Sequence, residues 1–146
     1  MNLRVIAEKA QKTGDYSELV GLIPYAQTIG VTCECFGDDV IFKLPQRASN
    51  LGNPILPAIH GGVLGGFMEI SASLYLIMYQ DTPKLPRIVD FSLDYLRAGL
   101  NRDTFVECQL TRQGNRVANV IVNAWQASRT KPIATARAHF IFDALD

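Results

Sequence analysis

Hydrophobic residues follow two different spacings along the chain, one in the middle and one in the second half. From Gly61 to Tyr79 nearly every position is apolar or small, which predicts a long helix surrounded by other elements. Alternating patterns then predict four strands that follow one another with short turns between them: Arg87–Leu96, Thr104–Thr111, Arg116–Ser128 and Ile133–Phe142. Every second residue of the last strand, from Ala134 to Phe142, is alanine or phenylalanine, which predicts one buried face, and the small alanines would let a helix lie close against it.

Shorter elements are predicted in the first part of the chain. Asp15 and Glu18 resemble a capping box, and apolar residues follow at helical spacing until Pro24, which predicts a short helix within an N-terminal helical segment over residues 1–28. Two β runs, Val31–Phe36 and Val40–Leu44, flank a Gly-Asp-Asp turn and predict a hairpin. Residues 46–59, rich in proline and asparagine, are predicted to form a loop.

The order of these elements is helix, hairpin, long buried helix and four antiparallel strands. This order predicts one α+β domain over residues 1–146, with a curved sheet wrapped around a central helix. A composition of 48% hydrophobic and 19% charged residues is typical of a single globular domain. We found no internal repeat or linker that would divide the chain.

Charge and cysteine content narrow the function classes. Lys plus Arg equals Asp plus Glu at 14 each, so no net field attracts the protein to nucleic acid or to an anionic membrane. Three cysteines without a CxxC pair argue against a disulfide framework or a zinc site. The N-terminus lacks the uninterrupted apolar core of a signal peptide, and Glu69 would be costly within a membrane span, so we expect a cytoplasmic protein.

Glu69 is the only charged residue between His60 and Asp81. On a helix buried all round, a carboxylate must be paired, neutralised or placed in a cavity. A general base needs such a position, although structural carboxylates occupy it as well. Glu69 is therefore the candidate catalytic group.

The predicted helix starts at Gly61-Gly62. The backbone N–H groups of a first helical turn lack partners within the helix, so they suit a substrate carbonyl oxygen that gains negative charge during a reaction. The same two glycines also suit a tight turn from loop to helix. Eight residues of helix place Glu69 about 12 Å from Gly61, which is more than one side chain spans. Two antiparallel helices in a homodimer would bring Glu69 of one subunit opposite Gly61 of the other.

Four segments of this chain carry a family resemblance. They are Ile59-His60-Gly61-Gly62, the acid Glu69, Val89-Asp90-Phe91 and Tyr95-Leu96-Arg97-Ala98. Through them the chain resembles, from Ile29 to Phe142, the hot-dog-fold thioesterases of the phenylacetate-pathway type. The resemblance implies hydrolysis of an acyl-CoA thioester to a carboxylic acid and CoA. It implies no cofactor or metal apart from the CoA of the substrate, and a homodimer that pairs into a tetramer.

The resemblance also implies roles for single residues. The N–H of Gly61, next to Gly62, polarises the thioester, while the acid at Glu69 acts as base or nucleophile, although relatives more often have Asp there. His60 positions the helix start or contacts substrate. Asn53 is the candidate for holding the attacking water, with turn formation as the alternative. The CoA channel is implied to be lined by four further residues: Tyr95, Arg97, Gly114 and Arg116.

Two other functions stay open at this point. A hot-dog dehydratase acting on an acyl thioester would need a histidine upstream of the helix, and no histidine precedes His60. A non-catalytic acyl-CoA binding module would keep the fold but would not require Glu69. The chain contains no GxSxG motif and no phosphate-binding loop, so serine hydrolases and nucleotide hydrolases are excluded.

Overall fold

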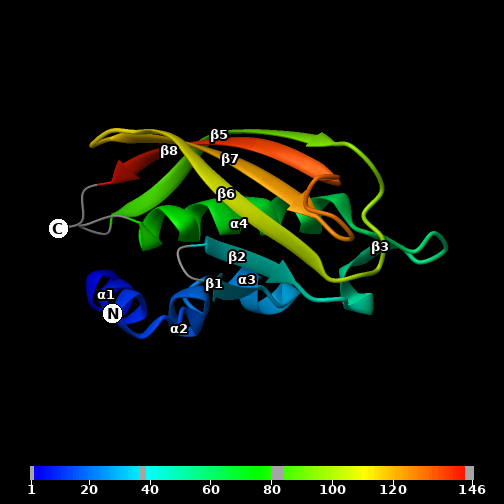
Figure 1. Cartoon of the computed structure of the whole chain (residues 1–146), viewed down its shortest axis with the longest axis horizontal. Helices are drawn as coiled ribbons and strands as arrows, with labels where there is room; N and C mark the ends of the chain where they lie inside the picture. Colours follow the sequence, from blue (N-terminus) through cyan, green and yellow to red (C-terminus); the bar gives the residue numbers. More distant parts are fainter. Residues whose placement is uncertain (1, 37–38, 80–83, 144–146) are drawn as a thin grey trace.

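A six-stranded antiparallel sheet curls around one long helix in the computed structural model, which describes residues 2–36, 39–79 and 84–143 (Figure 1). The helix is α4 (Gly61–Met78), and the strand order is β1-β2-β6-β7-β8-β5. The strands are β1 (Thr32–Phe36), β2 (Asp39–Leu44), β5 (Leu85–Tyr95), β6 (Thr104–Gln113), β7 (Val117–Trp125) and β8 (Ala134–Asp143). The predicted α+β architecture, with a curved sheet around a central helix, is confirmed.

The sheet ends on β5, which pairs with β8 instead of with its neighbour in sequence, β6. Its register with β8 runs from Leu85 opposite Asp143 to Tyr95 opposite Ala134, with a shift at Val89. Strands β6, β7 and β8 form a continuous antiparallel meander. The eleven-residue strand β5 therefore has a long edge with no partner strand in the described chain.

The core lies between α4 and the concave face of the sheet. The small side chains of Ala134, Ala136 and Ala138 are at most 2% exposed, and they allow the helix to pack closely against β8. Phe67 and Leu74 of α4 are fully buried against this face. The helix is long and apolar enough to span a membrane by composition alone, but 56% of it is buried, and it is the core helix of this fold.

Three helices form the N-terminal layer in place of the single helix expected there: α1 (Leu3–Thr13), α2 (Ser17–Val20) and α3 (Pro24–Ile29). The prediction that Pro24 ends a helix is wrong, because Pro24 is the first residue of α3, where no backbone N–H is needed. In Figure 1 these helices lie on the opposite side of α4 from strands β5 to β8.

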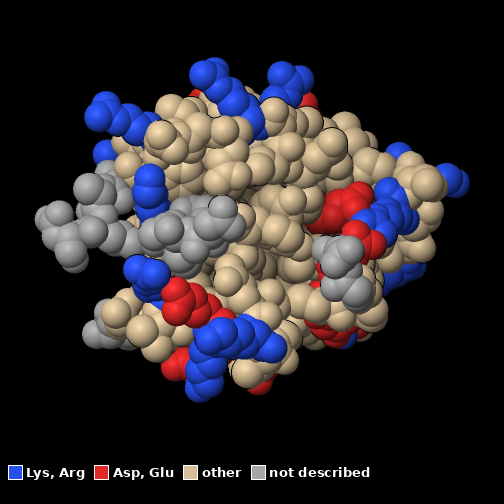
Figure 2. All heavy atoms as spheres, turned by 60° about the vertical axis from the view of Figure 1, so that its left-hand side comes forward, with Lys and Arg blue, Asp and Glu red and all other residues tan. Residues whose placement is uncertain are grey.

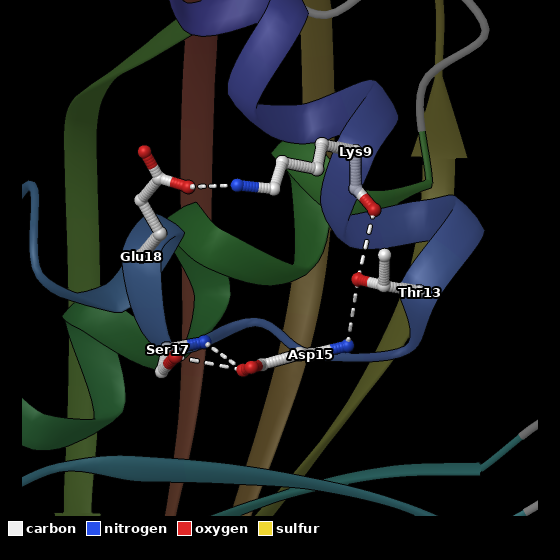
Figure 3. Close-up of polar contacts among 5 residues, drawn as sticks. All are labelled: Lys9, Thr13, Asp15, Ser17 and Glu18. Atoms are coloured by element: carbon white, nitrogen blue, oxygen red, sulfur yellow. Dashed lines mark hydrogen bonds and ion pairs between the residues drawn. The ribbon is translucent and has the colours of Figure 1, made fainter.

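Polar contacts fix the turn between α1 and α2 (Figure 3). The carboxylate of Asp15 accepts hydrogen bonds from Ser17 N–H at 3.0 Å and Ser17 Oγ at 2.7 Å, which lower the pKa of Asp15. The hydroxyl of Thr13 donates to the carbonyl of Lys9 at 2.9 Å. Glu18 forms an ion pair with Lys9 at 3.4 Å and does not complete a capping box.

The segment predicted as a loop, residues 46–59, contains regular structure. A 3-10 turn, η1 (Ala48–Asn50), leads into a small hairpin of β3 (Leu51–Asn53) and β4 (Ala58–Ile59). The hairpin joins the sheet end through Ile59 N–H, which donates to the carbonyl of Gly99 at 2.8 Å. This bond places the chain entering α4 beside the segment that follows β5.

Charged side chains are mixed in sign over the surface. On the face shown in Figure 2, Lys and Arg lie close to Asp and Glu around a broad uncharged area. Inside the molecule, burial raises the pKa of the Cys33 thiol to about 12 and also raises that of Cys108. All three cysteines are free, and the raised pKa values keep the partly buried Cys33 and Cys108 protonated at neutral pH.

Candidate active site

His60 caps the start of α4. Its Nδ1 accepts a hydrogen bond from the N–H of Gly62 at 2.9 Å, and its carbonyl accepts from Leu64 N–H at 3.1 Å. The first bond requires a neutral imidazole with its proton on Nε2. The prediction that both glycine N–H groups are open is therefore wrong for Gly62. The N–H of Gly61 has no acceptor among the described residues, so it is available to a ligand.

A pocket of about 360 Å³ opens at this end of α4. It brings together three residues that the sequence singled out, namely Gly61, Tyr95 and Arg97. The Tyr95 hydroxyl donates to the carbonyl of Gly61 at 2.6 Å and so fixes the first helical turn to the end of β5. The remaining lining residues are Ala58, Ile59, Leu64, Leu96, Ala98 and Gly99.

Two glycines of α4 lie where β5 crosses close to the helix. A Cβ added to Gly61 would lie 3.2 Å from Tyr95 Oη, and one added to Gly65 would lie 3.2 Å from Leu93 Cδ2. Both distances are tighter than ordinary van der Waals contact. The absence of side chains at these glycines thus lets β5 lie close to the start of α4, and it also lets a ligand approach the backbone there.

Glu69 lies half-buried on one uncovered face of α4, so the expected burial of this helix on all sides is wrong. Helical spacing puts it on the same face as Gly62, Gly66 and Ser73. The carboxylate makes no hydrogen bond or ion pair with any residue that the structure describes. A second chain that covered this face would therefore meet the carboxylate directly.

Two walls flank this face, which we call the Glu69 face (Gly62, Gly66, Glu69 and Ser73). On one side, Leu93 of β5 packs against Gly65. On the other, the ring of Tyr25 in α3 lies against Gly66. Spacing of about 100° per residue places Glu69 between these two contacts. Sequence reasoning overlooked Tyr25 and Ser73, and the only signal for Ser73 was its position one turn after Glu69.

Asn53 lies outside the pocket of its own chain. Its Oδ1 accepts hydrogen bonds from the N–H groups of Ile55 at 2.9 Å and Leu56 at 3.1 Å, and it thereby shapes the tip of the β3–β4 hairpin. The buried Asn50 is also occupied, because its Nδ2 donates to the carbonyl of Ile29 at 2.9 Å. Within one chain the turn-forming interpretation of Asn53 agrees with the geometry.

Gly114 and Arg116 lie at the other end of the sheet from the pocket. The N–H of Gly114 donates to the carbonyl of Val117 at 2.8 Å, and Val117 pairs with Ile141 of β8. Tyr95 pairs with Ala134, so the two sites are separated along β8 by seven residues, roughly 23 Å. One chain therefore does not bring Gly114 and Arg116 to the pocket that contains Arg97.

Comparison with known proteins identifies the family. Residues 56–133, which include β4, α4 and strands β5 to β7, match the family model described as the thioesterase superfamily. The chain belongs to the thioesterase superfamily. A solved protein from Chromobacterium violaceum is 39% identical, with a TM-score of 0.76, covering 96% of this chain and 98% of that one. No curated protein sequence matches the chain significantly.

More distant structures share the hot-dog fold of this thioesterase superfamily member. A thioesterase from Haemophilus influenzae is 18% identical with a TM-score of 0.76, covering 87% of this chain and 89% of that chain. A phenylacetic acid degradation-related protein from Ralstonia eutropha is 22% identical with a TM-score of 0.69, covering 86% and 98%. The predicted hot-dog fold is confirmed, and family membership assigns the chain to thioester hydrolysis.

Proposed function

We propose that this protein hydrolyses acyl-CoA thioesters in a site shared between two subunits. The observation that carries the proposal is the position of Glu69. Its carboxylate lies on the uncovered face of α4, about 12 Å along the helix from the open N–H of Gly61. A second copy of the chain supplies the missing half, so that Glu69 of one subunit acts with Gly61 of the other.

The free edge of β5 supports this dimer. The eleven-residue strand β5 lies at the edge of the sheet with no partner strand on its outer side among the described residues, and such an edge can pair with the same strand of a second copy. A two-fold axis makes the paired β5 strands antiparallel, and it also makes the two α4 helices antiparallel across the interface. Two such dimers would then form the tetramer that the family resemblance implies. Measurement of mass in solution tests both states.

The chemistry follows from these groups. The N–H of Gly61 donates a hydrogen bond to the thioester carbonyl oxygen, which becomes an oxyanion when water attacks the carbonyl carbon. Glu69 accepts the proton of that water as the new C–O bond forms. The C–S bond then breaks, and the proton passes from Glu69 to the departing CoA sulfur. The products are a carboxylic acid and CoA, with no cofactor and no metal involved.

CoA recognition uses residues from both ends of the sheet. Arg97 lines the pocket beside Tyr95 and offers a planar guanidinium to a phosphate. When the two β5 strands pair antiparallel, the partner's strands run in the opposite direction. The partner's β6–β7 turn, with Gly114 and Arg116, then lies toward the end of the sheet that holds this pocket. This arrangement explains why one chain holds the two sets of predicted CoA contacts far apart.

Three further assignments complete the proposal. His60 acts by holding the first turn of α4 and Gly62 in place, which keeps the Gly61 N–H directed at the substrate. The amide nitrogen of Asn53, on the exposed hairpin tip, stays a predicted contact to the attacking water. The protein is expected in the cytoplasm and acts on CoA thioesters without a membrane or nucleic-acid partner.

Thiol release from a panel of acyl-CoAs tests the function. Linear, branched and aromatic acyl groups, together with matched pantetheine thioesters, are incubated with the protein while free thiol is measured. We expect turnover of several CoA thioesters, and a lower KM for CoA than for pantetheine thioesters because Arg97 binds phosphate. Binding of acyl-CoA without release of thiol would identify a binding module. Water loss from a hydroxyacyl-CoA without thiol release would identify a dehydratase.

A further inference from the structure

Tyr25 lies against the Glu69 face from a separate element, α3. A Cβ added to Gly66 would lie 2.6 Å from Tyr25 Cε1, closer than two carbon atoms approach. Glycine at this position therefore makes room for the tyrosine ring. The contact joins the N-terminal helices to the helix that carries the catalytic carboxylate.

Helix geometry puts this ring next to the reacting groups. Gly66 precedes Glu69 by three residues and follows Gly62 by four, so both are its neighbours on the helix surface, with about 5–6 Å between Cβ positions. Tyr25 thus stands between the helix start and Glu69, along one side of the Glu69 face. The opposite side is formed by Leu93 of β5.

The short helix α3 holds the Tyr25 ring in place, and the rest of the described chain leaves part of the ring exposed. Pro24 starts α3, and Gly30, at a φ of 89°, ends it with an N–H that donates to Ala26. Tyr25 is 42% exposed, and its hydroxyl has no hydrogen-bond partner among the described residues. An aromatic side chain on a short fixed helix gives a rigid wall with one polar atom.

We infer that Tyr25 limits the space for the acyl group on the Glu69 face and selects compact, short acyl groups over long ones. This inference rests on the proposed function, because it places the thioester between Gly61 of one subunit and Glu69 of the other. An acyl chain that extends from that carbonyl along the Glu69 face meets the Tyr25 ring beside Gly66. Chain length is therefore limited by the ring and not by the backbone of α4.

The experiment measures kcat/KM for acetyl-, butyryl-, hexanoyl-, octanoyl- and lauroyl-CoA in wild type and in Tyr25→Ala. We expect the ratio of long-chain to short-chain kcat/KM to rise in Tyr25→Ala by on the order of tenfold or more. Tyr25→Phe retains the ring and should keep the wild-type ratio. Tyr25→Leu, which still packs on Gly66, gives a second shortened side chain if Tyr25→Ala does not fold.

A second arm tests the contact itself. Gly66→Ala should lower kcat/KM in wild type, because its Cβ displaces the ring, and should have little effect in the Tyr25→Ala background. An unchanged chain-length ratio in both Tyr25→Ala and Tyr25→Leu, while wild type hydrolyses acyl-CoA, would overturn the inference and leave the proposed function standing. Absence of thiol release by wild type from every thioester would overturn both.

Discussion

The two halves of α4 differ in what they contribute. The first half begins with the open N–H of Gly61 beside a pocket and holds four glycines: Gly61, Gly62, Gly65 and Gly66. The second half holds large side chains that are almost fully buried: Leu74, Leu76, Ile77 and Met78. Its end is closed by α1, since Gln11 Nε2 donates to the carbonyl of Met78 at 2.6 Å.

The second half of α4 therefore contributes mainly to stability, and the first half to the proposed chemistry. Glycine within a helix costs roughly 0.5–1 kcal/mol relative to alanine, so the first half is a poor helix by itself. The packing of the second half under the sheet stabilises the whole helix and lets the first half keep close approach and open backbone groups.

Leu74→Ala should have the largest effect and should act on stability. Removal of this fully buried side chain leaves a cavity in the second half of α4, which is expected to cost about 2–5 kcal/mol of unfolding free energy. Urea unfolding followed by circular dichroism measures the loss. Val5→Ala, at an apolar residue of α1 that is 57% exposed, is the control and should change stability little. Equal losses in both variants would contradict the packing role of the second half.

Glu69→Gln should act on rate and not on stability. Loss of the proton acceptor is expected to lower kcat by on the order of a hundredfold, about 2.7 kcal/mol of activation free energy. Steady-state thiol release and thermal unfolding are measured on the same sample. Glu34→Gln, at an exposed acid on β1, should leave both unchanged. A kcat within twofold of wild type would remove Glu69 from the mechanism.

His60→Ala should affect both quantities moderately. The variant loses the acceptor for the Gly62 N–H, which is expected to cost about 1 kcal/mol of stability and to lower kcat because the first turn loosens. His60→Asn restores an N-cap acceptor and should recover most of the stability and part of the rate. If His60→Asn recovers stability while activity stays as low as in His60→Ala, the imidazole contacts substrate directly.

Gln11→Ala should have the smallest effect, confined to the closed end of α4. The variant leaves the Met78 carbonyl without its side-chain donor, at a cost of about 0.5–1.5 kcal/mol. Activity per folded molecule should stay at the wild-type value because the pocket lies at the far end. Gln109→Ala, at an exposed glutamine of β6, controls for loss of a glutamine. A fall in kcat would show that the two ends are coupled.

The sequence predicted the parts of the molecule that depend on local patterns. The extent of α4 and of β5 to β8 follows from hydrophobic spacing, and the meeting of Gly61 with Tyr95 and Arg97 follows from the family resemblance. Pro24 was misinterpreted because proline ends some helices and starts others, and only the tertiary context of α3 decides between them.

Features that depend on contacts between distant parts of the chain could not be predicted from local sequence patterns. The contact of Tyr25 with Gly66 joins residues that are far apart in the chain, and no periodicity signals it. The half-buried state of Glu69 depends on which face of α4 the sheet leaves uncovered. The distance between Arg97 and Gly114 depends on the register of β5 on β8, which one slip of pairing would change.

A mixed dimer tests the shared site most directly. Gly61→Pro removes the N–H at the first helical position, which proline suits, and His60 before it already has the ψ of 129° that a residue preceding proline prefers. Proline also adds a Cβ that would lie 3.2 Å from Tyr95 Oη, so Gly61→Ala, which keeps the N–H, is the matched control. Each variant alone, Glu69→Gln or Gly61→Pro, should be nearly inactive. The two chains are coexpressed with different tags, and the mixed dimer is purified and assayed for thiol release.

The mixed dimer holds one site with both defects and one site with neither if Glu69 and Gly61 act across the interface. It should therefore regain about half of the wild-type activity per dimer. If Glu69 and Gly61 of the same chain act together, every site in the mixed dimer carries one defect. A mixed dimer as inactive as the two parent variants would contradict the shared site.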